Sequence, residues 1–235
     1  MQDRKSPIVP SHLLDRIIWE SLTTHHRGIS VGDELARRYP HDVAPFAATM
    51  DTSPEAWNSL HGLMSPGEAV VLFTTKVVNA PGQFQLTQPM VLDQMIGPIH
   101  GEPAVGTPIA PLGVTDIDDV MALIHLTNPG PFRPRTLELG RYLGVRVDGR
   151  LAAMAGERMH PGGYVEISAV CAHPDFRGRG YPRDLILTLT RDVQARGEMP
   201  MLHAANQNEA AISLYRKLGF VTRTSVHLNV VRRAD

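Results

Sequence analysis

The sequence predicts an α/β protein of two unequal parts, and three observations lead to this expectation. Amphipathic patterns at helical spacing alternate with runs of β-branched and apolar residues. A stretch rich in glycine and proline, GPIHGEPAVGTPIAP, lies between residues 97 and 111 and interrupts both patterns. Beyond it, a strand, a glycine-rich turn and a helix follow one another directly. We therefore expect a smaller N-terminal α/β region at 1–105 and a second α/β domain at 106–235.

Composition excludes several classes of function. The chain has 235 residues, of which 43% are hydrophobic and 20% charged, as is usual for a globular protein. Its formal net charge of -1 argues against nucleic-acid and membrane partners. No signal peptide or apolar span of ~20 residues is evident, so a cytoplasmic location is expected. One cysteine and scattered histidines without HExxH spacing predict no metal site.

In the N-terminal region, two helices and one strand are expected. Apolar residues recur at helical spacing over 13–22 after Ser11, a candidate cap. Ser53 and Pro54 begin a second helical pattern, which ends near Leu63. The β-branched run at 69–78 predicts a strand. The apolar residues over 84–97 fit neither the helical nor the strand period. This stretch therefore stays unassigned between strand and short helix.

In the C-terminal region, Thr115 or Asp116 can cap a helix that ends at the Asn-Pro-Gly-Pro stretch from residue 128. Two strands joined at Asp148-Gly149 are typical of a hairpin with positive φ at both turn residues. A third strand over 164–172 has Glu166 among mostly apolar neighbours. These elements lead directly into the glycine-rich turn.

The turn HPDFRGRGYP and the helix after it have the features of an anion site. Glycines let the backbone approach a phosphate, and the free N–H groups and dipole of a helix start attract it. The spacing matches neither GxxxxGK[ST] nor GxGxxG, which argues against a P-loop or a dinucleotide site.

The segment VCAHPDFRGRGYP resembles the central [QR]xxGx[GA] motif of the GNAT acyltransferase superfamily, with Arg177, Gly180 and residue 182 at its defining places. In that family the turn amides hold the pyrophosphate of coenzyme A. The resemblance implies this role for Arg177, Gly178, Arg179, Gly180, Tyr181 and Pro182. Pro182 replaces a small residue and has no N–H, so weaker binding is expected, although proline suits a first helical turn.

A second segment, MLHAANQNEAAISLYRKLGF, resembles the family's later strand and helix through Asn208, Ala211, Leu214, Tyr215 and Gly219. The resemblance covers about half of the chain. It implies a GNAT fold, a mixed sheet flanked by helices, with acetyl-CoA as co-substrate and no metal. The general layout and the EISAV strand also resemble the glycine N-acyltransferase branch.

Four side chains are candidates for catalysis or cofactor contact. Glu166 is the candidate general base, since family members carry one at this place and an apolar strand would raise its pKa; alternatively it binds an arginine. His203 is the second candidate base, although a strand histidine is more often structural. The family motif implies that Tyr215 is the acid for the departing thiolate. Asn208 either contacts the pantetheine arm or caps a helix, or does both.

The resemblance also implies that the backbone of Val170, Cys171 and Ala172 runs along the pantetheine like an added strand. Cys171 is expected to pack in the core or to line the site, and not to act as a nucleophile, because transfer in this family is usually direct and no adjacent histidine would activate the thiol.

The sequence therefore predicts transfer of an acetyl group from acetyl-CoA to a primary amine of a small molecule or peptide. The main alternative is a non-catalytic CoA-binding regulatory module, which Pro182 motivates. A nucleic-acid contact through the two arginines of the turn is disfavoured by the charge balance. The N-terminal part is expected to shape the acceptor pocket or to form a homodimer contact, and both remain open.

Overall fold

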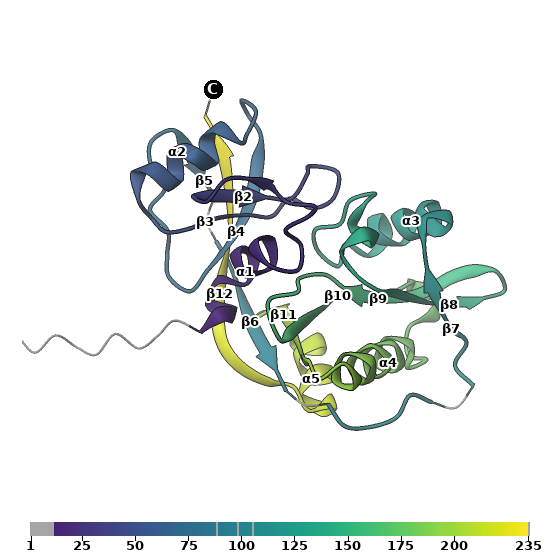
Figure 1. Cartoon of the computed structure of the whole chain (residues 1–235). Coiled ribbons are helices and arrows are strands. Elements are labelled where there is room, and N and C mark those ends of the chain that lie inside the picture. The colour runs from purple at the N-terminus through teal and green to yellow at the C-terminus, as the bar shows by residue number, and fades with distance from the viewer. Residues whose placement is uncertain (1–11, 88, 98, 105, 235) are drawn as a thin grey trace, which may run out of the picture.

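The computed structural model describes residues 12–87, 89–97, 99–104 and 106–234 (Figure 1). The helices are η1 (Leu13–Arg16), α1 (Ile17–Thr23), α2 (Pro54–Gly62), η2 (Val114–Asp116), α3 (Ile117–Thr127), η3 (Thr136–Leu139), η4 (Pro174–Phe176), α4 (Tyr181–Ala195) and α5 (Glu209–Leu218). The strands are β1 (Val31–Gly32), β2 (Ala36–Arg38), β3 (Ala47–Thr49), β4 (Ala69–Thr74), β5 (Phe84–Leu86), β6 (Met90–Ile96), β7 (Ile109–Leu112), β8 (Tyr142–Val147), β9 (Arg150–Glu157), β10 (Tyr164–Ala172), β11 (Met199–Ala205) and β12 (Val221–Arg233).

The strands form a small antiparallel sheet, β1-β2-β3, and a nine-stranded sheet in the order β4-β12-β6-β11-β10-β9-β8-β7, with β5 also paired to β12. In the large sheet β10 and β11 are parallel, whereas β6 is antiparallel to both β11 and β12. The expected mixed sheet flanked by helices is therefore confirmed. Strands from both sides of the expected boundary at residue 106 share this sheet, and the division into two domains stays a prediction.

Helices cover both faces of the large sheet. Leu143 and Val145 of β8 pack with α4 and α5 in one core, while their neighbour Tyr142 packs with α3 on the opposite face. This alternation is what the two-residue period of a strand requires. A third core joins η1 and α1 to β4, β6, β11 and β12. In Figure 1, α4 and α5 lie together on one side of the sheet and α1 and α3 on the other.

The helix caps and the strand that the sequence predicts in the N-terminal region are confirmed in part. Ser53 caps α2 by accepting from the Ala56 amide at 3.3 Å, and Pro54 is the first helical residue, as predicted. Ser11 lies outside the described residues, and His12 caps η1 instead. The predicted strand at 69–78 is β4 and ends at Thr74, and the unassigned stretch forms β5 and β6.

The hairpin of the C-terminal region is confirmed, with φ of 50° at Asp148 and 77° at Gly149 between β8 and β9. Asp116 precedes α3 without a side-chain cap bond. Its carboxylate instead accepts from the Gly113 amide and pairs with Arg146. Within the described residues, no helix is long and apolar enough to span a membrane.

Candidate active site

The site is built where β10 and β11 part. The two parallel strands pair only over 164–166 and 199–201, and beyond Glu166 strand β10 pairs with β9 alone. A bulge between Ser168 and Cys171, with φ of 52° at Ala169, bends this half of β10. The backbone of Val170, Cys171 and Ala172 therefore has a free edge on the β11 side. Such an edge can pair with an extended ligand arm as it would with a strand.

The glycine-rich turn follows β10 through η4. Gly178 and Gly180 have φ of 75° and 80°, in the left-handed region where glycine avoids the cost of a side chain. A Cβ at either position would meet no atom within 4 Å, so the space above the turn is open. The first helical bond of α4 runs from the Asp184 amide to the Gly180 carbonyl. Before it, the amides of 178–181 have no partner among the described residues.

The turn fits a pyrophosphate by charge as well as by geometry. Arg177 and Arg179 are exposed and make no ion pair with the described residues. The Arg179 guanidinium lies over the Phe176 ring at 5.2 Å, which orients this cation at the start of α4. Pro182 takes the second helical position, where an intrahelical donor is not needed. The residues present therefore fit the cofactor phosphates, even with the amide of residue 182 missing.

Replacing Gly180 by alanine tests the backbone conformation of the turn. We expect G180A to lower the free energy of unfolding by about 1–2 kcal/mol, because a Cβ disfavours the left-handed φ of 80°. CoA binding should weaken as the turn relaxes. The control is G162A, at a glycine outside the positive-φ set and with equally open space. Urea unfolding measures both, and equal loss in the two variants would contradict the role of φ.

Helix α5 carries Tyr215, and Asn208 stands at its N-terminal cap. The Asn208 side chain accepts from the Ala211 amide at 3.1 Å and caps α5, which confirms the capping half of its expected role. Tyr215 is 8% exposed, and its hydroxyl has no hydrogen-bond partner among the described residues. Burial, with the nearby Cys171, raises the pKa of Tyr215 to about 12. The Tyr215 side chain packs in the core of α4 and α5, whereas the Cys171 side chain packs with α3 on the other face of the sheet.

Glu166 lies in a different environment from the one expected. Its side chain is 1% exposed and makes a two-bond ion pair with Arg158, at 2.9 and 2.8 Å. The His203 ring nitrogen Nδ1 lies 2.7 Å from its Oε1. Burial raises the pKa of Glu166, but Arg158 and His203 outweigh burial and hold the pKa at about 2. The expected rise of this pKa is therefore wrong, because a buried cation faces the carboxylate.

His203 is equally enclosed, with 2% of its side chain exposed. Its Nε2 lies 3.0 Å from Nε2 of Gln94, whose Oε1 accepts from Arg223 at 2.5 Å. The Gln94 amide nitrogen must therefore donate to His203, which leaves the histidine proton on Nδ1 to bond Glu166. Both ring nitrogens are occupied. The roles of Glu166 and His203 as bases stay predictions. His203 presents no free lone pair in this arrangement, while Glu166 accepts two bonds at Oε1 and one at Oε2.

Sequence reasoning missed the partners of this buried network. Arg158 directly follows β9, and its amide donates to the Glu166 carbonyl across the hairpin. An opposite charge at the end of the neighbouring strand was a signal that sequence reasoning could have used. Gln94, Arg223 and the Asp15 that pairs with Arg223 come from distant segments, so no local pattern indicates them. Within the described residues, no group of three or more His, Cys, Asp or Glu side chains could hold a metal ion.

Comparison with known proteins places this geometry in a family. Residues 142–228 match the family model described as FR47-like protein. An acetyltransferase of the GNAT family from Novosphingobium aromaticivorans has a solved structure 36% identical to this chain. That match covers 96% of this chain and 100% of the other, with a TM-score of 0.87. A GCN5-related N-acetyltransferase from Kribbella flavida, 15% identical, shares the fold over 94% of this chain and 96% of its own, with a TM-score of 0.63.

Curated relatives match over shorter stretches. Mycothiol acetyltransferase from Saccharomonospora viridis is 34% identical over 92 residues, which are 35% of this chain and 30% of the relative. An acetyltransferase from Yersinia pestis is 33% identical over 91 residues, which are 37% of this chain and 62% of the relative. The chain thus spans less than two thirds of these curated relatives. The resemblance to the glycine N-acyltransferase branch stays a prediction. From the whole-length match and the fold, the chain belongs to the GNAT family of acetyltransferases.

Proposed function

We propose that the protein transfers an acetyl group from acetyl-CoA to a primary amine of a small molecule or peptide. One observation carries this proposal: the free edge of β10 leads into an open glycine-rich turn. Within the described residues, the amides of this turn have no partner and its two arginines form no ion pair. Family membership supports acetyl transfer, and the turn supports coenzyme A as the carrier. Acetyl-CoA would supply an activated acyl carbon, and the phosphates of CoA would lie against Arg177, Arg179 and the turn amides.

In the proposed mechanism, the neutral amine attacks the acetyl carbon directly, and the thioester carbon–sulfur bond breaks. Tyr215 donates its hydroxyl proton toward the departing sulfur, while the amine nitrogen loses a proton to a base. Burial raises the pKa of Tyr215 to about 12, so its hydroxyl carries a proton to donate at neutral pH.

The proton of the attacking amine needs an acceptor. Glu166, acting through water, stays the base predicted from the sequence. Its two-bond pair with Arg158 and its contact with His203 support a second role, holding β10 in place where the strands part. The kcat of the variant E166Q distinguishes a base from a residue that only holds the strand.

The binding step is tested by calorimetric titration with desulfo-CoA. We expect wild-type protein to bind, and the double variant R177A/R179A to bind at least about tenfold more weakly, because charge-assisted bonds to phosphate are lost. The exposed pair variant R232A/R191A, away from the turn, controls for net charge. Equal affinity in all three proteins, or no binding by wild type, would contradict the proposed cofactor site.

The transfer step is tested by thiol release from acetyl-CoA in the presence of a panel of primary amines, including amino acids, polyamines and peptides. We expect amine-dependent release and an acetylated product of matching mass. Binding of desulfo-CoA without release on any amine would instead favour the non-catalytic CoA-binding module. Homodimer formation and a role of the N-terminal part in acceptor binding stay proposals.

A further inference from the structure

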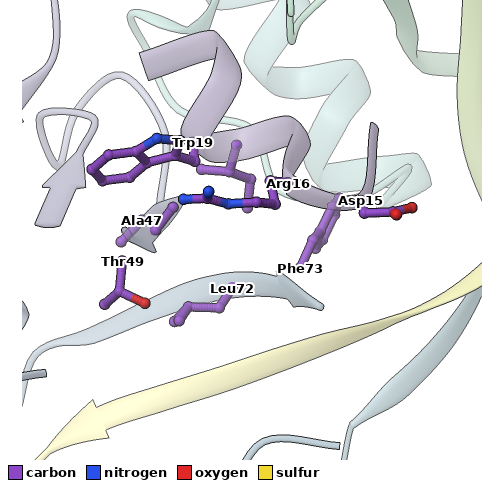
Figure 2. Close-up of a pocket in the computed structure, with 9 residues that line it drawn as sticks. Asp15, Arg16, Trp19, Ala47, Thr49, Leu72 and Phe73 are labelled. Atoms are coloured by element: carbon purple, nitrogen blue, oxygen red, sulfur yellow. The ribbon is translucent and has the colours of Figure 1, made fainter. Parts of the chain in front are cut away.

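A small pocket lies in the N-terminal part, between η1 and α1 above and β3 and β4 below (Figure 2). Its volume is about 70 Å³, well above the ~10–15 Å³ that a cavity needs on this measure to hold one water molecule, so a small ligand fits. The lining is formed by Asp15, Arg16, Ile18, Trp19, Ala47, Ala48, Thr49, Leu72 and Phe73. Most of these side chains are apolar, so the pocket has an apolar floor and few polar groups.

The polar groups that face the pocket are hydrogen-bond donors. In Figure 2 the Arg16 guanidinium extends beside the Trp19 indole toward Ala47. Arg16 donates one bond, to the Met50 carbonyl at 2.5 Å, and lies 5.4 Å from the Trp19 ring centre. Its remaining N–H groups, the Trp19 indole N–H and the Thr49 hydroxyl have no hydrogen-bond partner among the described residues. The pocket therefore offers a cation and two further donors together.

The nearby carboxylates do not neutralise Arg16. Asp15 points away from the pocket in Figure 2, and its two oxygens accept from Arg223 and from the His12 amide. Asp51, whose pKa is lowered chiefly by Ser53 and only slightly by Arg16, bonds the amide and hydroxyl of Ser53. Neither acid forms an ion pair with Arg16 within the described residues. The guanidinium is thus half-buried without an anion.

We propose that this pocket binds a small monocarboxylate with a short apolar tail. The carboxylate would bond Arg16 and Thr49, and the tail would lie on Leu72 and Phe73. A half-buried guanidinium without a counter-ion favours an anion, since a planar fork of donors matches a carboxylate. The small volume and apolar floor favour a carboxylate with a short tail over a phosphate ester. None of the lining residues belongs to β10, α4 or α5, although Phe73 packs on the His203 ring at 4.9 Å, so the pocket borders the candidate active site without sharing the phosphate-facing turn.

The test uses nuclear magnetic resonance of the full-length protein labelled with nitrogen-15. The chain has two tryptophans, so the indole N–H of Trp19 reports on the pocket. Trp57, which is 3% exposed in another core, reports on the fold. We expect butyrate to shift the Trp19 signal with a dissociation constant on the order of 10 mM or lower, given its few atoms. Butyramide, which has the same shape without charge, should shift it far less.

Two variants make the test specific. R16Q should weaken butyrate binding at least about tenfold, because charged hydrogen bonds are lost, while the Trp57 signal stays unchanged. R27Q, at an exposed arginine after α1, should bind like wild type. Saturating desulfo-CoA should leave the butyrate shift intact. Equal shifts with butyramide, unchanged binding by R16Q, or displacement of butyrate by desulfo-CoA would overturn the proposal.

Discussion

Glutamine at position 166 is expected to lower the free energy of unfolding by about 3–5 kcal/mol, because it leaves the buried Arg158 cation without its anion. Arg158 is 7% exposed and Glu166 is fully buried, so water cannot replace the lost carboxylate. Urea unfolding of E166Q at neutral pH measures the loss. The double variant R158M/E166Q, which also removes the cation, should recover much of it. If E166Q alone were as stable as wild type, the ion pair would not hold this part of the sheet.

The effect should depend on pH in a defined direction. The folded pKa of Glu166, about 2, is below its ordinary value of 4.5, so the carboxylate stabilises the folded state above pH 4.5. That contribution is lost as pH falls toward 2, and the difference between wild type and E166Q should close over this window. E138Q removes the exposed partner of Arg135, and the stability should change little at any pH.

The kcat of E166Q shows whether Glu166 acts as a base or only positions the strand. At a temperature where E166Q is fully folded, a positioning role predicts largely retained kcat and an unchanged pH profile. A base role predicts a fall in kcat of about 10²-fold or more. Thiol release on an acceptor from the amine panel measures both quantities. A large loss of kcat in a folded variant would show that Glu166 takes up the proton despite its pair with Arg158.

Phenylalanine at position 215 is expected to lower kcat by about 10²-fold, since the departing sulfur loses its proton donor. The KM for acetyl-CoA should change little, because the hydroxyl acts mainly after the cofactor is bound. Burial, with the nearby Cys171, raises the pKa of Tyr215 to about 12, so the hydroxyl stays protonated at all ordinary assay pH values. Wild-type kcat should therefore not fall through loss of this proton below about pH 11.

The Y215F experiment needs a matched tyrosine. Tyr164 begins β10, and its hydroxyl is 3.5 Å from His12 on the opposite face of the sheet from α5. Y164F should retain wild-type kcat. The two variants are compared by thiol release at saturating acetyl-CoA, with mass analysis of the product. Full turnover by Y215F while chemistry limits the rate would show that another group protonates the sulfur.

Local sequence predicted the parts of the site that depend on short stretches of chain. Gly178 and Gly180 indicated a glycine-rich turn between strand and helix, because such a turn is set within a few residues, and both glycines have positive φ in the structure. Asn208 indicated the start of α5, since a cap acts over three residues. The strand, turn and helix of the anion site followed in the predicted order for the same reason. The hairpin at Asp148-Gly149 was equally local.

Features that depend on contacts between distant segments could not be predicted from local patterns in the sequence. The stretch over 84–97 fitted neither period, and its strand β6 is specified by pairing with β11 and β12, more than 100 residues later in the chain. The pKa of Glu166 went in the opposite direction from the one expected, because Arg158 and His203 meet it only in the folded sheet.

The sequence by itself thus determined the order of elements, the glycine-rich turn and the family resemblance, all of which rest on local backbone preference and motif spacing. The tertiary structure decided which charges are buried together. It placed Arg158 and His203 against Glu166 and inserted β6 between β11 and β12. The physical reason is that the pKa of a buried group depends on desolvation and on partners brought from distant segments, and neither is encoded in its immediate neighbours.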